Sequence, residues 1–121
     1  MEGGEESGIV VALSEARRER FDGPVTFDRR ELDQILRVYG TMVAAGEWRD
    51  YAIDHLRDEA VFSVYRRTSE VPLYRIVKTP KLRARQGAYS VVAATGVILK
   101  RGHELARVLG VFDGKLKLVK A

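Results

Sequence analysis

The chemically reactive residues of this 121-residue chain are few and widely spaced. There is no cysteine, which excludes disulfides, thiolate zinc sites and cysteine nucleophiles. The two histidines, His55 and His103, lie far apart in the sequence, and no nucleophile elbow or glycine-rich phosphate loop occurs. On a strand, Asp50 and Asp54 would lie about 13 Å apart, farther than the roughly 5–9.5 Å between glycosidase carboxylates. We therefore predict a protein that is not an enzyme and that holds no metal or cofactor.

Positive charge is the clearest functional signal. Residues 66–121 contain 13 Lys and Arg against 3 Asp and Glu, a net charge of +10. Residues 1–65 contain 8 against 14, a net charge of −6. This division predicts a basic surface that binds phosphate groups or an acidic protein surface. The candidate phosphate-binding or nucleic-acid-binding residues are Arg66, Arg67, Arg75, Lys78, Lys81, Arg83, Arg85, Lys100 and Arg101.

The surroundings of these cations indicate how a nucleic acid would be bound. Lys100 and Arg101 precede a predicted helix, whose N-terminal N–H groups would favour an anion. Three interleaved tyrosines are able to stack on bases, although tyrosines in strands more often belong to the core; they are Tyr65, Tyr74 and Tyr89. Asparagine is absent and no helix-turn-helix is present. We therefore expect contacts to phosphates, or recognition of RNA or of shape.

The first element that would position these residues is a helix over residues 29–45. Asp28 is a suitable N-cap, and Glu31 completes a capping box. Gly46 follows, where a left-handed residue ends many helices. The apolar stripe expected to face the core consists of Leu32, Ile35, Leu36, Tyr39, Met42 and Val43.

Strand patterns fill the middle of the chain. The predicted strands are 49–55, 60–66, 73–78, 89–94 and 97–100, with Thr95-Gly96 as a two-residue turn before the last. A second helix is predicted from 102 or 103 to 110, then a strand at 115–119. Trp48 is expected to cap the core where the first helix meets the sheet. The fold class is therefore α+β, a mainly antiparallel sheet of four to six strands with two amphipathic helices packed on one face.

The chain divides into a tail and one domain. Residues 1–24 are predicted to be a flexible acidic and charged N-terminal tail, in which residues 9–13 are able to form a strand. Residues 25–121 are predicted to form a single α+β domain. No apolar stretch reaches the roughly 20 residues that span a bilayer, and the start is unlike a signal peptide. We expect a cytoplasmic protein without a membrane partner.

Several runs of residues resemble a known family. They are residues 27–32 (FDRREL), 35–40 (ILRVYG), 46–54 (GEWRDYAID), 86–92 (QGAYSVV) and 98–103 (ILKRGH). The chain resembles, over about residues 25–120, an uncharacterised family of small alphaproteobacterial proteins catalogued as a domain of unknown function. The resemblance implies a bacterial protein and brings no activity, cofactor or site residue with it.

Three functions remain from these observations, and one of them, small-molecule binding or catalysis, rests on little beyond the expected anion seat at the second helix. The first is a nucleic-acid-associated accessory or regulatory protein that binds phosphate through its basic C-terminal half. The alternative is a protein–protein interaction domain or homodimer with no nucleic-acid role, favoured by exposed strand edges and by the division of charge.

Overall fold

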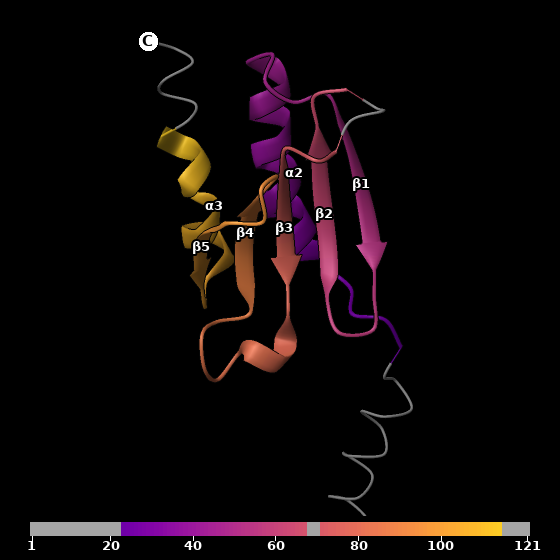
Figure 1. Cartoon of the computed structure of the whole chain (residues 1–121), viewed down its shortest axis with the longest axis vertical. Helices are drawn as coiled ribbons and strands as arrows, with labels where there is room; N and C mark the ends of the chain where they lie inside the picture. The colour runs from indigo at the N-terminus through magenta and orange to yellow at the C-terminus, as the bar shows by residue number, and fades with distance from the viewer. Residues whose placement is uncertain (1–22, 68–70, 115–121) are drawn as a thin grey trace, which may run out of the picture.

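The computed structural model describes residues 23–67 and 71–114 of the chain. Its elements follow in the order helix, three strands, a short 3-10 helix, two strands and a helix (Figure 1). None of the helices in this part of the chain is both long and apolar enough to cross a membrane. The predicted tail at 1–24 lies almost wholly outside the described residues, and the predicted strands at 9–13 and 115–119 lie wholly outside them.

The strands form one antiparallel sheet. They are β1 (Asp50–His55), β2 (Ala60–Tyr65), β3 (Tyr74–Lys78), β4 (Tyr89–Ala93) and β5 (Ile98–Gly102), and η1 (Pro80–Leu82) connects β3 to β4. Their order in the sheet is β1-β2-β3-β4-β5, so each strand pairs with its neighbour along the chain. The predicted antiparallel sheet is therefore confirmed, with strand ends that differ by one or two residues.

The helix α2 (Arg29–Ala44) begins at the predicted capping box. The backbone N–H of Glu31 donates to Asp28 Oδ1 at 2.8 Å, and the N–H of Asp28 donates to Glu31 Oε1 at 2.7 Å. At the other end, Gly46 takes a left-handed conformation with φ of +79°, which a residue with a side chain rarely adopts. Both ends of α2 are thus set by residues that the sequence indicates.

The core-facing stripe of α2 is rotated from the predicted one. Ile35 and Met42 are buried, whereas Leu36 is 39% exposed, so the prediction that Leu36 lies in the core is wrong. Val43 of the predicted stripe is also 39% exposed. The buried residues of α2 are Glu31, Ile35 and Met42, and the half-buried Leu32, Val38 and Tyr39 pack beside them against the core. Leu36 lies about 100° around the helix axis from Ile35, which turns it toward the flank of the sheet.

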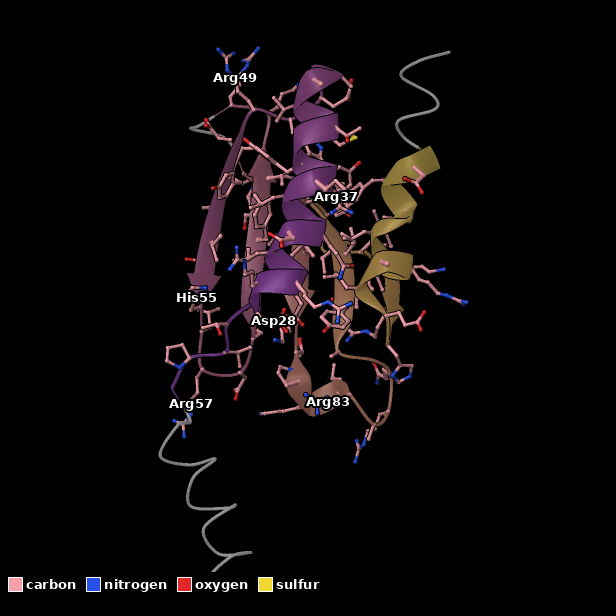
Figure 2. All side chains as sticks on the ribbon, turned by 180° about the vertical axis from the view of Figure 1, so that it is seen from behind. Asp28, Arg37, Arg49, His55, Arg57 and Arg83 are labelled. Carbon is pink, nitrogen blue, oxygen red and sulfur yellow. The ribbon has the colours of Figure 1, made fainter. Side chains whose placement is uncertain are left out.

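The second helix, α3 (Leu105–Leu109), lies on the same face of the sheet as α2 (Figure 2). Its buried Leu105, Val108 and Leu109 join the main core with Ile35 of α2 and the buried strand residues Phe62, Ile76 and Val91. The predicted packing of both helices on one face is confirmed. The helix begins two or three residues later than predicted, because the preceding strand β5 extends to Gly102.

Trp48 closes the core at the point where α2 meets the sheet. Its side chain is 3% exposed, and its ring meets Phe112 edge-on, with ring centroids 4.9 Å apart. The predicted core position of Trp48 is therefore confirmed.

The connection between β4 and β5 has three residues, so the predicted two-residue turn is wrong. The backbone N–H of Ala93 donates to the carbonyl oxygen of Val97 at 2.8 Å, which leaves residues 94–96 as the loop. Gly96 takes φ of +92° at the last loop position. A three-residue hairpin loop commonly needs a left-handed residue there, and glycine supplies it.

Candidate anion-binding site

The two faces of the sheet differ in what covers them. Both helices lie on one face, and no helix of the described part of the chain covers the other, which we call the open face (Figure 1). Side chains alternate between the faces along each strand, so the pairing register gives the residues of the open face. One row is Asp54, Val61, Val77, Ser90 and Arg101, and the next is Ala52, Ser63, Arg75, Val92 and Ile98.

Small side chains form the floor of the open face. Val61, Val77 and Val92 make an apolar cluster separate from the main core. Ser63 and Ser90 lie among them and are buried. Among the strand residues of the open face, the acidic ones are Asp50 and Asp54 of β1, at one edge of the sheet. The central floor is therefore apolar and uncharged, with two hydroxyl groups.

Two arginines border this floor. Arg75 on β3 lies opposite Ser63 on β2, and Arg101 on β5 lies opposite Ser90 on β4. The two arginines are two strands and two residues apart, which separates their Cα atoms by about 12 Å. Because an arginine side chain is long, both guanidinium groups are able to reach one ligand on the floor between them.

The guanidinium of Arg101 is incompletely hydrogen-bonded. Its Nη1 atom is buried and meets no hydrogen-bond acceptor in the described part of the chain. Neither Arg101 nor Arg75, both half-buried, forms an ion pair with a described residue. Arginine stays charged in proteins, and a buried charged donor without an acceptor is destabilising by about 1–3 kcal/mol or more. This site therefore lacks an acceptor that the chemistry of Arg101 requires.

Lys78, another candidate residue, points to the opposite face of the sheet. Its Nζ donates to Glu31 Oε1 at 2.8 Å and to the carbonyl oxygen of Thr26 at 2.9 Å. The hydroxyl of Tyr89 donates to Glu31 Oε2 in a short hydrogen bond. Together these residues form the Glu31–Lys78–Tyr89 cluster, which attaches the start of α2 to β3 and β4. Lys78 is thus held by a partner within the fold.

The remaining candidate cations lie apart from one another. Arg66 and Arg67 follow β2 and are exposed at one end of the sheet. The exposed loop around η1 lies at the other end of the sheet, where Figure 2 labels Arg83, and its cations are Lys81, Arg83 and Arg85. Lys81 Nζ lies 3.3 Å from Asp58 Oδ1 in an exposed ion pair. The nine candidates therefore do not converge on one surface.

The expected anion seat at the second helix is not formed as the sequence indicated. Lys100 and Arg101 lie within β5, where Lys100 is opposite Val91 and Arg101 is opposite Ser90, so the two side chains take opposite faces. The helix itself has only five residues, and the Glu104 carboxylate at its N-cap pairs with Arg107 at 3.0 Å.

The tyrosines are also divided. Tyr74 packs on Phe112 with ring centroids 5.2 Å apart, on the helix side. Burial, with the hydrogen bond to Glu31 and the charge of that carboxylate, raises the pKa of Tyr89 to about 12. Tyr65 remains on the open face, next to Asp50 in the register. The described surface therefore offers few aromatic side chains on which bases would stack.

Two residues of the site were not singled out from the sequence. Ser63 and Ser90 each interrupt a run of apolar strand residues, in AVFSVY and YSVVA. A serine at a buried strand position opposite an arginine is the signal that would have found them, but it requires the pairing register. The described residues contain no group of three or more His, Asp or Glu side chains placed to hold a metal ion.

A family comparison identifies the chain. Residues 25–109 match the sequence profile of a family described as "Protein of unknown function (DUF2794)". The chain belongs to this family. The matched residues of the DUF2794 domain include every described strand, the open face and the Glu31–Lys78–Tyr89 cluster. The match ends at the last residue of α3. No curated protein and no solved structure gives a match.

Proposed function

We propose that this DUF2794 domain is a non-enzymatic, nucleic-acid-associated protein whose open face binds backbone phosphates through Arg75 and Arg101. The observation that carries the proposal is the buried Nη1 of Arg101, which meets no acceptor in the described residues. Because this atom is buried, the Arg101 side chain would have to turn outward to bind a phosphate. A phosphate oxygen is a charged acceptor that suits the geometry of a guanidinium group. Ser63 and Ser90 lie opposite the two arginines in the register, but both residues are buried.

The distribution of charge supports a polyanion as the ligand. The acidic residues of this face belong to β1, two strands away from Arg75 and four strands from Arg101. Exposed Arg83 and Arg85 lie beyond the end of the sheet that is nearer to Arg101. A phosphate backbone that runs across the sheet from β3 to β5 would thus move away from the acidic edge at β1 and toward Arg83 and Arg85.

The contacts on this face favour the backbone over the bases. Tyr65 is the aromatic residue of the described open face, and it lies at the end of β2. Without a row of stacking side chains, recognition would be dominated by phosphate and would weaken strongly with salt. We therefore expect binding with little dependence on nucleotide sequence.

A titration with labelled duplex DNA at several salt concentrations tests the proposal. The wild-type chain should bind at low salt, with log affinity falling linearly with log salt concentration. The R75Q/R101Q variant should bind more weakly, and its slope should be shallower by about two units if each arginine neutralises one phosphate. The variant should stay folded, because both arginines lack ion pairs with described residues.

R37Q/R107Q is the matched control, because Arg37 belongs to α2 (Figure 2) and Arg107 to α3, both on the helix side of the sheet. It should lower affinity far less than R75Q/R101Q, although the net charge changes equally. Equal losses from both variants would show that only net charge matters and would contradict a site on the open face. A flat titration of folded wild-type protein would reject nucleic acid and favour the carboxylates of an acidic protein partner.

A further inference from the structure

The two edges of the sheet are built differently. At β5, Val92 pairs with Ile98 and Val91 pairs with Lys100, so Leu99 is the extra residue of a β-bulge. Lys100 and Arg101 follow directly. Bulges and charged residues of this kind prevent an edge strand from pairing with another chain. In contrast, all six residues of β1 pair with β2 in unbroken register.

The outer edge of β1 carries regularly spaced backbone groups. The N–H of Leu56 donates to the carbonyl oxygen of Glu59 at 2.8 Å across the turn between β1 and β2. Hydrogen-bonded pairs alternate along an antiparallel ladder, so the even-numbered residues of β1 bond to β2. The N–H and C=O groups of Tyr51, Ile53 and His55 therefore point away from the sheet. No described residue outside the sheet forms a backbone hydrogen bond with them, so they are able to pair with a further strand.

The side chains beside this edge are apolar and incompletely covered. Tyr51 is 45% exposed and Ile53 is half-buried, both on the helix side of β1. Leu36 and Val43 of α2 are each 39% exposed. In Figure 2, β1 lies beyond the edge of α2, which does not cover it. An exposed apolar shelf next to an open strand edge is typical of a protein interface.

The charges of β1 favour one register if this strand pairs with β1 of a second copy of the chain. A two-fold axis at Ala52 would place Asp50 directly opposite Asp54 of the partner subunit, twice, which is unfavourable. An axis at Ile53 places Asp54 opposite the uncharged Ala52 of the partner subunit. It also joins the two Ile53 side chains and sets Tyr51 against His55 of the partner subunit. This second register uses the outward backbone groups of Tyr51, Ile53 and His55.

We propose that β1 pairs antiparallel with β1 of a second copy of this chain, about a two-fold axis at Ile53. The two five-stranded sheets then form one continuous sheet. Because the axis is perpendicular to the sheet, both open faces lie on the same side. The Cα atoms of the two Arg75 residues would be five strand spacings, or roughly 24 Å, apart. If the open face binds phosphate, the dimer presents two such sites to one polyanion.

Sedimentation velocity of the full chain over a range of micromolar concentrations tests the dimer. Wild-type protein should show a reversible monomer–dimer equilibrium. A52D places a new carboxylate opposite Asp54 of the partner subunit, twice across the interface, so it should weaken dimerisation by about tenfold, or about 1.4 kcal/mol. A52K pairs opposite charges at the same positions and should strengthen dimerisation by a similar factor. Ala52 is exposed, so both variants should fold, and circular dichroism checks this.

K100D on β5 is the control and should leave the equilibrium unchanged. Wild-type protein that stays monomeric at every concentration would overturn the proposal. A dimer weakened by both A52D and A52K would overturn the Ile53 register, and one weakened by K100D instead would move the interface to β5. None of these variants removes Arg75 or Arg101, so failure of the dimer and failure of phosphate binding are distinguishable.

Discussion

The two faces of the sheet differ in whether their charged side chains have hydrogen-bond partners within the fold. On the helix side, the Glu31 carboxylate accepts hydrogen bonds from Lys78, from Tyr89 and from the backbone of Asp28. On the open face, Arg101 holds a buried Nη1 with no acceptor in the described part of the chain. The first arrangement is complete within the fold, whereas the second leaves one charged donor without an acceptor among the described residues. Charges of the first kind maintain the structure, and charges of the second kind are the ones to test for function.

The largest effect should come from breaking the complete arrangement. Lys78→Met leaves the buried Glu31 carboxylate without its cation, which should lower the free energy of unfolding by about 3 kcal/mol. Lys81→Met is the control, because its ion pair with Asp58 is exposed on both sides and should change stability by less than about 1 kcal/mol. Urea denaturation measures both. A Lys78 variant as stable as the Lys81 variant would show that the Glu31–Lys78–Tyr89 cluster does not stabilise the fold.

Alkaline pH offers a smaller test of the same cluster. The pKa of Tyr89 is about 12 in the folded protein, against an ordinary value of 10.0, because burial and the Glu31 carboxylate disfavour the phenolate. The unfolded chain therefore releases this proton first as pH rises. The contribution to stability is complete below pH 10 and is lost between pH 10 and about 12.

Tyr89→Phe removes this titrating group and checks the assignment. Stability of the variant should fall less steeply over the same pH window. Some loss should remain, because burial, Asp50 and Tyr51 also raise the pKa of Tyr39. A wild-type stability that does not decline between pH 10 and 12, measured by urea denaturation at each pH, would contradict the burial of Tyr89 against Glu31.

Local patterns were enough to predict much of the fold. The capping box of Asp28 and Glu31, the stop at Gly46 and the strand alternation depend on neighbours in sequence, and the structure has all three. The burial of Leu36 was predicted wrongly, because helical spacing defines a stripe but not how far the helix is rotated on the sheet. The length of the loop before β5 was also predicted wrongly, because the local Thr95-Gly96 pattern does not show that Ala93 pairs with Val97.

The candidate site was predictable only in part. Composition indicated a set of cations that includes Arg75 and Arg101, but it ranked Lys78 equally with them. Lys78 differs because strand alternation turns it toward the helix side, where Glu31 lies 47 residues away in sequence. Ser63 and Ser90 become part of the site through cross-strand register. Such pairings join distant segments, so no local pattern contains them.

The most direct test of the unsatisfied charge is the stability of Arg101→Met with and without duplex DNA at low salt. Without DNA, the variant should be more stable than wild type by about 1 kcal/mol, because it removes a half-buried charge that has no ion-pair partner among the described residues. DNA should stabilise wild type and stabilise the variant much less. Arg107 forms an exposed ion pair with Glu104, so the Arg107→Met variant should have the stability of wild type both with and without DNA. An Arg101 variant that is less stable than wild type, and that gains as much stability from DNA as wild type does, would contradict both the unsatisfied charge of Arg101 and its role in binding phosphate.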